Sequence, residues 1–225
     1  MTILTVLFSI TLSLLFAAAF GAGSDKNGKT SGTQPNIHDP GEQVGDWRTA
    51  LQYLVDGNLR YVANRTMARE TNARDRDVLK NGQKPFAVVV TCADSRVAPE
   101  IYFDQKLGDI FVLRNAGNIA DATVLGSIEY AVEHLRAPLI VVVGHSKCGA
   151  VSGAYNGGEF PGNLQTILDT IRRSIRNSAS LEDAIYDHMT GVVKRIEEND
   201  IVEETGAKVI GAIYDIETGK VTFTV

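Results

Sequence analysis

The chain has 225 residues, of which 44% are hydrophobic and 22% are charged, and this composition suits one globular domain with an apolar core. Its formal net charge is -5, with acidic and basic residues interspersed along the sequence. Because the sequence contains no basic stripe, it argues against a nucleic acid as a partner and against a large polyanion as a substrate.

The amino-terminal segment has the character of an export signal. Residues 3–20 are almost wholly apolar, and the first charged side chain is that of Asp25. Small residues end this run, and Ala19-Phe20-Gly21 fits a cleavage pattern. We therefore expect residues 1–21 to be a signal peptide and the protein to be periplasmic or secreted. An uncleaved membrane anchor is the alternative, because the segment starts without Lys or Arg and is barely long enough to span a bilayer.

The next segment has the composition of a linker. Gly, Ser, Thr, Asn, Asp and Pro dominate residues 24–41, so we expect residues 22–45 to form a flexible linker in which His38 is exposed. Residues 46–225 are then expected to form the folded domain.

Helices and strands alternate through this domain. An amphipathic helix is predicted over residues 47–64 after the N-cap Asp46, followed by a polar surface segment over residues 66–83. The strands predicted next are residues 86–91, 110–114, 138–144 and 208–214, and the helices are residues 124–135, 164–176 and 182–198. A turn over residues 217–220 makes the last strand, residues 221–225, antiparallel to the strand before it. The pattern predicts an α/β fold with a mainly parallel sheet flanked by helices.

Both cysteines of the chain follow predicted strands. Cys92 comes directly after residues 86–91, and His145 and Cys148 follow residues 138–144. Ligands of parallel sheets bind beyond the carboxyl ends of the strands, and adjacent strands lie about 5 Å apart, so the two motifs can meet if these strands are neighbours. Two thiols and an imidazole form a Cys2His set, which is a recognised catalytic zinc arrangement with a fourth position for water.

A carboxylate and a guanidinium accompany the first cysteine. Asp94 and Arg96 alternate with Cys92 on an extended segment, so the three side chains can share one side of it. Arg96 can hold Asp94 in a charge-assisted pair, and Asp94 can then accept a hydrogen bond from a zinc-bound hydroxide. Alternatively, Asp94 can take the fourth position on the zinc ion and close the site. A further alternative is a non-catalytic secreted domain in which Cys92 and Cys148 form a disulfide.

Two short runs carry a family resemblance. Residues 92–97 read CADSRV and residues 144–149 read GHSKCG, and together they resemble the β-class carbonic anhydrases. Other segments that look like this family are residues 57–61, 111–118, 126–132 and 211–215. The resemblance covers about residues 47–225, which is the whole expected domain.

The resemblance carries implications for fold, chemistry and assembly. It implies a sheet of four parallel strands plus an antiparallel fifth, flanked by helices. It implies one Zn2+ per chain and the reversible hydration of CO2 to bicarbonate and a proton through zinc-bound hydroxide, which would make the protein a carbonate dehydratase, a lyase. It also implies a homodimer or a higher homo-oligomer, with each active site at the subunit interface.

The resemblance also assigns roles to single residues. The residues that match the family's zinc ligands are Cys92, His145 and Cys148. The residues that match its catalytic dyad are Asp94 and Arg96. The residues that match its substrate-binding positions are Gln83, Phe111 and Gly117.

One departure from the family pattern bears on regulation. Some bacterial members have a regulatory bicarbonate pocket with a Trp three residues before the first zinc cysteine. This chain has Val89 at that position, although the matching arginine is present as Arg114. We therefore expect the open type of site, in which water fills the fourth zinc position.

The alternative enzymatic function is hydrolysis of carbonyl sulfide or carbon disulfide on the same scaffold.

Overall fold

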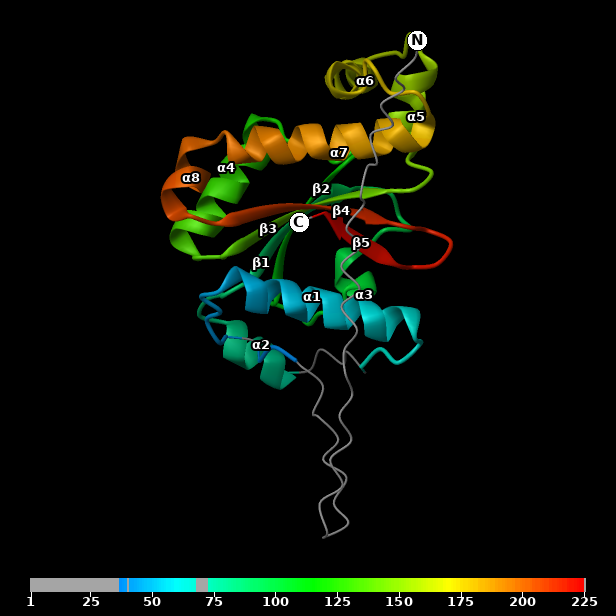
Figure 1. The fold of residues 1–225 in the computed structure, drawn as a ribbon. Coiled ribbons are helices and arrows are strands. Elements are labelled where there is room, and N and C mark those ends of the chain that lie inside the picture. The colour runs from blue at the N-terminus through cyan, green and yellow to red at the C-terminus, as the bar shows by residue number, and fades with distance from the viewer. Residues whose placement is uncertain (1–36, 40, 68–72, 225) are drawn as a thin grey trace, which may run out of the picture. The chain divides into compact units, whose positions relative to one another are not determined.

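A mixed sheet of five strands forms the centre of the part of the chain that the structure describes (Figure 1). The computed structural model describes residues 37–39, 41–67 and 73–224. The expected signal peptide, residues 1–21, lies outside these ranges, as does most of the expected linker. The strands are β1 (Ala87–Cys92), β2 (Ile110–Asn115), β3 (Leu139–His145), β4 (Lys208–Tyr214) and β5 (Val221–Thr224).

The strand order is β2-β1-β3-β4-β5. The pairs β1–β2, β1–β3 and β3–β4 are parallel, and β5 pairs with β4 in the antiparallel direction. The predicted α/β fold with four parallel strands and an antiparallel fifth is therefore confirmed.

Helices lie on both sides of the sheet in Figure 1, with α1 and α2 on one side and α4, α7 and α8 on the other. The helices are α1 (Trp47–Val62), α2 (Ala73–Leu79), α3 (Pro99–Tyr102), α4 (Ala122–Glu129), α5 (Gly149–Asn156), α6 (Asn163–Ser174), α7 (Leu181–Glu197) and α8 (Asp200–Thr205), with a π-helical turn, η1 (Tyr130–His134), after α4. The long predicted helices are confirmed. The sequence did not assign α3, α5 or α8, because α3 and α8 are short and α5 lies in a glycine-rich stretch.

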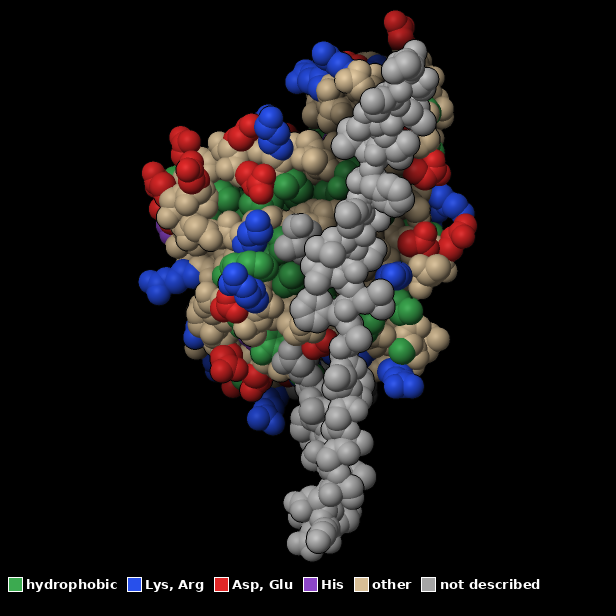
Figure 2. Space-filling model, in the orientation of Figure 1, with side chains coloured by type: hydrophobic (Ala, Val, Ile, Leu, Met, Phe, Trp, Pro, Cys, Tyr) green, Lys and Arg blue, Asp and Glu red, His purple; other side chains and the backbone are tan. Residues whose placement is uncertain are grey.

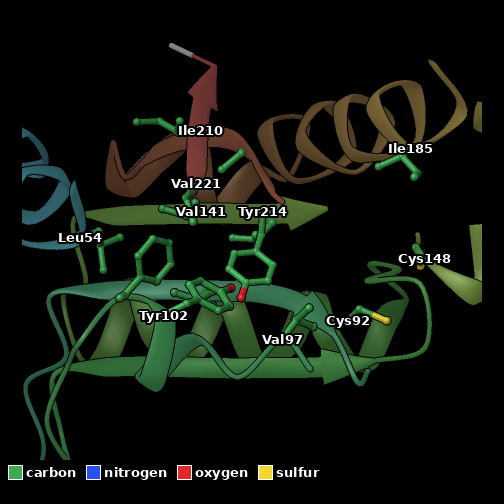
Figure 3. Packing of buried hydrophobic residues seen from close by; sticks show 14 of the residues in the cluster. Leu54, Cys92, Val97, Tyr102, Val141, Cys148, Ile185, Ile210, Tyr214 and Val221 are labelled. Atoms are coloured by element: carbon green, nitrogen blue, oxygen red, sulfur yellow. The ribbon is translucent and has the colours of Figure 1, made fainter. Parts of the chain in front are cut away.

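The alternation of side chains along β1 and β3 divides the core between the two faces of the sheet. Val89 and Val141 belong to the cluster that includes Leu54 of α1, and Figure 3 shows this side of the core. Val88 and Val142 belong to the cluster on the other face, which includes residues of α4 and α7. Both faces are covered, so these strands read as continuous apolar runs and bury every side chain.

His38 is buried, so the prediction that it is exposed in a linker is wrong. Only 2% of the residue is accessible, and its ring contacts those of Tyr53 and Phe86. Its Nδ1 lies 2.8 Å from Oδ1 of Asp109, and its Nε2 lies 3.0 Å from the carbonyl oxygen of Glu42. Burial lowers the pKa of His38, but the hydrogen bonds to Asp109 and Glu42 outweigh burial and raise it.

The surface of the described residues carries charges of both signs. Figure 2 shows acidic and basic side chains interspersed over the visible face. Within the described ranges, none of the helices combines the length and the apolar character that crossing a bilayer requires.

Candidate metal centre

The parallel pairing of β1 with β3 brings the two cysteine motifs together. Thr91 pairs with Val143 in this register, and each strand ends within two residues of that pair, at Cys92 and His145. Cys148 follows as the N-cap of α5. The ligand atoms of Cys92, His145 and Cys148 all lie within 4.8 Å of one another, and all three residues are buried. Figure 3 shows both cysteines at the same end of the packed core.

The turn from His145 to Cys148 is held against the end of β4. Ser146 donates its N–H to the carbonyl oxygen of Tyr214 at 3.0 Å, and its hydroxyl oxygen accepts from the N–H of Ile216 at 2.9 Å. Lys147 adopts a left-handed conformation with φ 57°, which reverses the chain between the two candidate ligands.

His145 presents a nitrogen lone pair to the two sulfur atoms. Its Nδ1 lies 2.9 Å from the carbonyl oxygen of Ser146, which can only accept, so Nδ1 carries the hydrogen and Nε2 carries the lone pair. Nε2 is buried and has no hydrogen-bond partner among the described residues. A buried lone pair beside two thiols fits a zinc ion, and the backbone contact at Nδ1 orients the ring as the outer partners of metal-bound histidines do.

The two thiols lie within 4.8 Å of each other. Both cysteines are free thiols, the form from which zinc ligands are made. The neighbouring thiol of Cys148, and the N–H groups of Gly117 and Asp94 at 3.4 Å each, lower the pKa of Cys92. The hydrogen bond to Cys92 and burial raise the pKa of Cys148. The site therefore favours one thiolate at Cys92, and a divalent cation would displace the remaining proton.

Asp94 and Arg96 form the ion pair that the sequence predicts. Nε of Arg96 lies 2.9 Å from Oδ1 of Asp94 and Nη2 lies 2.6 Å from Oδ2, and the N–H of Arg96 donates to Oδ1 at 2.9 Å. The hydrogen bonds from Arg96 hold the pKa of Asp94 well below its usual range. In this structure Asp94 is bound to Arg96 and lies outside the group of candidate metal ligands, so its place on a zinc ion in a closed state stays a prediction.

Arg114 supports this segment in a way that the sequence did not indicate. From β2, its Nε donates to the carbonyl oxygen of Cys92 at 3.1 Å and its Nη2 donates to the carbonyl oxygen of Asp94 at 2.8 Å. One guanidinium therefore holds the backbone on both sides of Ala93. No sequence signal identifies such contacts, because their acceptors are main-chain atoms.

Gly117 lies beside the first sulfur atom. Its N–H donates to Sγ of Cys92 at 3.4 Å, and its φ of 74° falls in the left-handed region. A Cβ at this position would lie 2.6 Å from Cδ1 of Ile171, a distance that real Cβ atoms essentially never show. The left-handed φ therefore favours glycine here, and a Cβ would in addition force the end of the Ile171 side chain to move.

Gln83 and Phe111 lie at the other end of the sheet. Gln83 is exposed in the segment that leads into β1, and Phe111 pairs with Val88 near the start of that strand. The strand spans about 17 Å between its ends at about 3.3 Å per residue. The structure therefore does not bring these two residues to the metal-ligating group of the same chain.

Comparisons with known proteins agree with this geometry. A family model described as carbonic anhydrase matches residues 87–221. The chain belongs to the carbonic anhydrases. Carbonic anhydrase 2 of Mycobacterium tuberculosis is 40% identical over 185 residues, which cover 76% of this chain and 89% of that protein. The relatives that match are named as enzymes. As a member of the same family, this chain is an enzyme as well.

Solved structures identify the class as β. A β-carbonic anhydrase of Sordaria macrospora, described as tetrameric, superposes with a TM-score of 0.62 at 27% identity and covers 78% of this chain and 98% of that one. The β-carbonic anhydrase of Coccomyxa, solved with acetazolamide, has a TM-score of 0.62 at 29% identity, covering 71% of this chain and 82% of that one.

Replacing Gly117 by alanine tests how tightly this backbone is constrained. We expect Gly117→Ala to lower the free energy of unfolding by about 1–3 kcal/mol, because a non-glycine residue is strained at this φ and its Cβ would collide with Ile171. We also expect less zinc per chain, because a displaced backbone at position 117 would withdraw its N–H from Sγ of Cys92. Urea unfolding and metal analysis measure the two effects.

Gly149→Ala is the matched control, since its Cβ would meet nothing within 4 Å although it adjoins Cys148. Equal losses in both variants would contradict the prediction.

Proposed function

We propose that this carbonic anhydrase is a zinc enzyme that catalyses the reversible hydration of CO2 to bicarbonate and a proton. The observation that carries the proposal is that the ligand atoms of His145 and two buried cysteines lie within 4.8 Å of one another, while Nε2 of His145 has no hydrogen-bond partner among the described residues. Membership of the family supports both the reaction and the metal. Cys92, His145 and Cys148 would hold one zinc ion per chain, and the ion would supply the Lewis acidity that makes water reactive near neutral pH.

We also propose that Asp94 acts on the attacking water. Its carboxylate accepts three hydrogen bonds from Arg96, and a carboxylate has about four lone-pair sites, so it can accept one more. Its lowered pKa keeps it ionised, and therefore an acceptor, at physiological pH. We assign to Asp94 the role of accepting the hydrogen of the water and aiming its oxygen lone pair at CO2. Arg96 and Arg114 position Asp94 through its carboxylate and its carbonyl group.

We further propose that the active site is completed by a second copy of the chain. Gln83 and Phe111, which match substrate-binding positions of the family, lie at the end of the sheet away from Cys92 of their own chain. In a homodimer or higher homo-oligomer, these residues would reach the partner's metal centre. The tetrameric relatives from Sordaria macrospora support assembly into homo-oligomers.

The proposed reaction and the role of Asp94 can be tested together. We expect zinc-loaded protein to hydrate CO2, and Asp94→Asn to lower kcat/KM by about 10²–10⁴-fold, because positioned acid–base groups contribute this much. Zinc content should stay unchanged, since Asp94 is not among the candidate ligands. Stopped-flow CO2 hydration and metal analysis provide the readouts, with carbonyl sulfide assayed in parallel.

Asp169→Asn is the control for this experiment, because Asp169 lies on α6 and pairs with Arg172. Undiminished turnover in Asp94→Asn would refute the role of Asp94. Wild-type protein that is metal-free, with Cys92 and Cys148 oxidised to each other, would refute the proposed function itself. Faster turnover of carbonyl sulfide than of CO2 would reassign the substrate.

A mixing experiment tests the two-chain site. Gln83→Ala keeps the candidate zinc ligands, and Cys92→Ser keeps Gln83. If each site combines the metal of one chain with Gln83 of the other, co-expressed mixed oligomers should be more active than the two homo-oligomers averaged, because one site in each mixed pair is intact. Tandem affinity tags isolate the mixed species. Activity no higher than that average would show that Gln83 does not act across the interface.

For the termini, we propose that residues 1–21 export the protein to the periplasm or the exterior, and that residues 22–45 connect this signal to the domain. The apolar run of residues 3–20 and the small residues after it support the proposal. The mass of the mature chain and its distribution among cell fractions test it. A full-length chain in the cytosol would contradict export, and a full-length chain in the membrane fraction would indicate an anchor.

A further inference from the structure

His188 forms a hydrogen bond with Gly117, which in turn forms one with Cys92 of the candidate metal centre. The residue is on α7, and only 3% of it is accessible. Its Nε2 lies 2.6 Å from the carbonyl oxygen of Gly117, and the N–H of Gly117 donates to Sγ of Cys92. A single residue therefore separates the imidazole from the sulfur of a candidate metal ligand.

The hydrogen positions on His188 follow from its partners. A carbonyl oxygen can only accept, so Nε2 must donate to Gly117. Burial lowers the pKa of His188, which favours the neutral ring with a lone pair at Nδ1. Oγ of Ser174 lies 2.9 Å from this Nδ1 and 2.8 Å from the carbonyl oxygen of Ile171, so its single hydroxyl hydrogen has two acceptors within reach, one of which is Nδ1. The imidazole is thus held on both sides, by α6 and by the loop of Gly117.

His188 lies at the edge of the core, beside a cleft. The cleft has a volume of about 400 Å³ and is lined by polar side chains such as Thr170 and Arg195 and by apolar ones such as Ile119 and Val192. Gly191 lets α6 approach α7 here, because a Cβ at that position would lie 2.9 Å from Cβ of Ser174. The packing of the two helices therefore fixes the serine that orients the imidazole.

The backbone of Gly117 is flexible by itself, so contacts with other residues must hold it in place. Gly117 has no side chain and a left-handed φ, so its backbone is constrained mainly by its hydrogen bonds. The N–H and the carbonyl group of Gly117 belong to different peptide units. A donor on the carbonyl group therefore acts by fixing the orientation of the backbone, and it does not strengthen the N–H as a donor directly.

We propose that His188 is a positioning residue of the metal centre, which holds Gly117 so that its N–H stays on the sulfur of Cys92. This inference rests on the proposed zinc site. The N–H fixes the position of the sulfur and stabilises the thiolate, so its loss should ease metal release even though the freed sulfur becomes a stronger electron donor. Ser174 belongs to the same arrangement, as the residue that orients the ring of His188.

Three substitutions separate this role from packing. In His188→Gln, the amide nitrogen can reach the position of Nε2 and donate to Gly117. In His188→Asn, the amide is too short to do so, and His188→Leu fills the space without a donor. We expect the Asn and Leu variants to release zinc to a chelator about 10–100-fold faster than wild type, the scale of losses seen for outer partners of metal ligands. The Gln variant should recover most of the wild-type rate.

A spectroscopic readout reports on the sulfur itself. In cobalt-substituted protein, loss of the N–H bond should make the thiolate a stronger donor and move the sulfur-to-cobalt charge-transfer band to longer wavelength in the Asn and Leu variants. The Gln variant should keep the wild-type band. His134→Leu is the matched control, because His134 is an exposed histidine in η1. Ser174→Ala should shift the band in the same direction by a smaller amount, and it decides the question if the Leu variant does not fold.

The outcomes distinguish this inference from the proposed function. Wild-type protein that binds neither zinc nor cobalt would end the proposed function and the inference together. Wild-type protein that binds both, with His188→Leu matching it in release rate and band position, would overturn the inference alone. A Leu variant closer to wild type than the Gln variant would assign His188 to packing and also overturn it.

Discussion

The site depends on the parallel pairing of β1 with β3. This register places the last residues of two strands, Cys92 and His145, at the same edge of the sheet. Side chains alternate between the two faces of a strand, so a shift of one residue in either strand would turn its ligand to the opposite face. Side chains on the two faces of β1 and β3 pack against separate clusters, so the register of these strands is set together with the packing of both. The core thus determines the geometry of a site that lies at its margin.

Two acidic groups of the site have lowered pKa values, the thiol of Cys92 and the carboxyl group of Asp94. Two main-chain N–H groups and the neighbouring thiol lower the pKa of Cys92, and Arg96 does the same for Asp94. The guanidinium of Arg96 donates hydrogen bonds to the carboxylate of Asp94, and that of Arg114 donates to main-chain carbonyl oxygens of the same segment. The carboxylate is therefore held by Arg96 and lies outside the group of candidate ligands, and the open type of site stays a prediction.

The sequence predicted most of the sheet and the residues that the structure gathers, for a physical reason. Continuous apolar runs identify buried parallel strands, and polar or thiol residues at their carboxyl ends then fall at one edge, as Cys92 and His145 do. The supports of the site were not predictable in this way. Gly117 lies 25 residues from Cys92 and His188 lies 71 residues from Gly117, and both act through main-chain atoms that leave no pattern in the sequence. The prediction for His38 was wrong for the same reason. Its partner Asp109 is distant in the chain, and the local composition indicated a linker.

The backbone contacts around the centre have a consequence for divergence within the family. Arg114, His188 and the ring of His145 all bind carbonyl oxygens, and Cys92 accepts from peptide nitrogens. Peptide groups are chemically the same whichever side chains flank them, so mutation at most neighbouring positions leaves these contacts available. Such a centre tolerates extensive drift in the surrounding sequence while its few reactive side chains persist. Chains that are only 27–29% identical to this one can then share its fold.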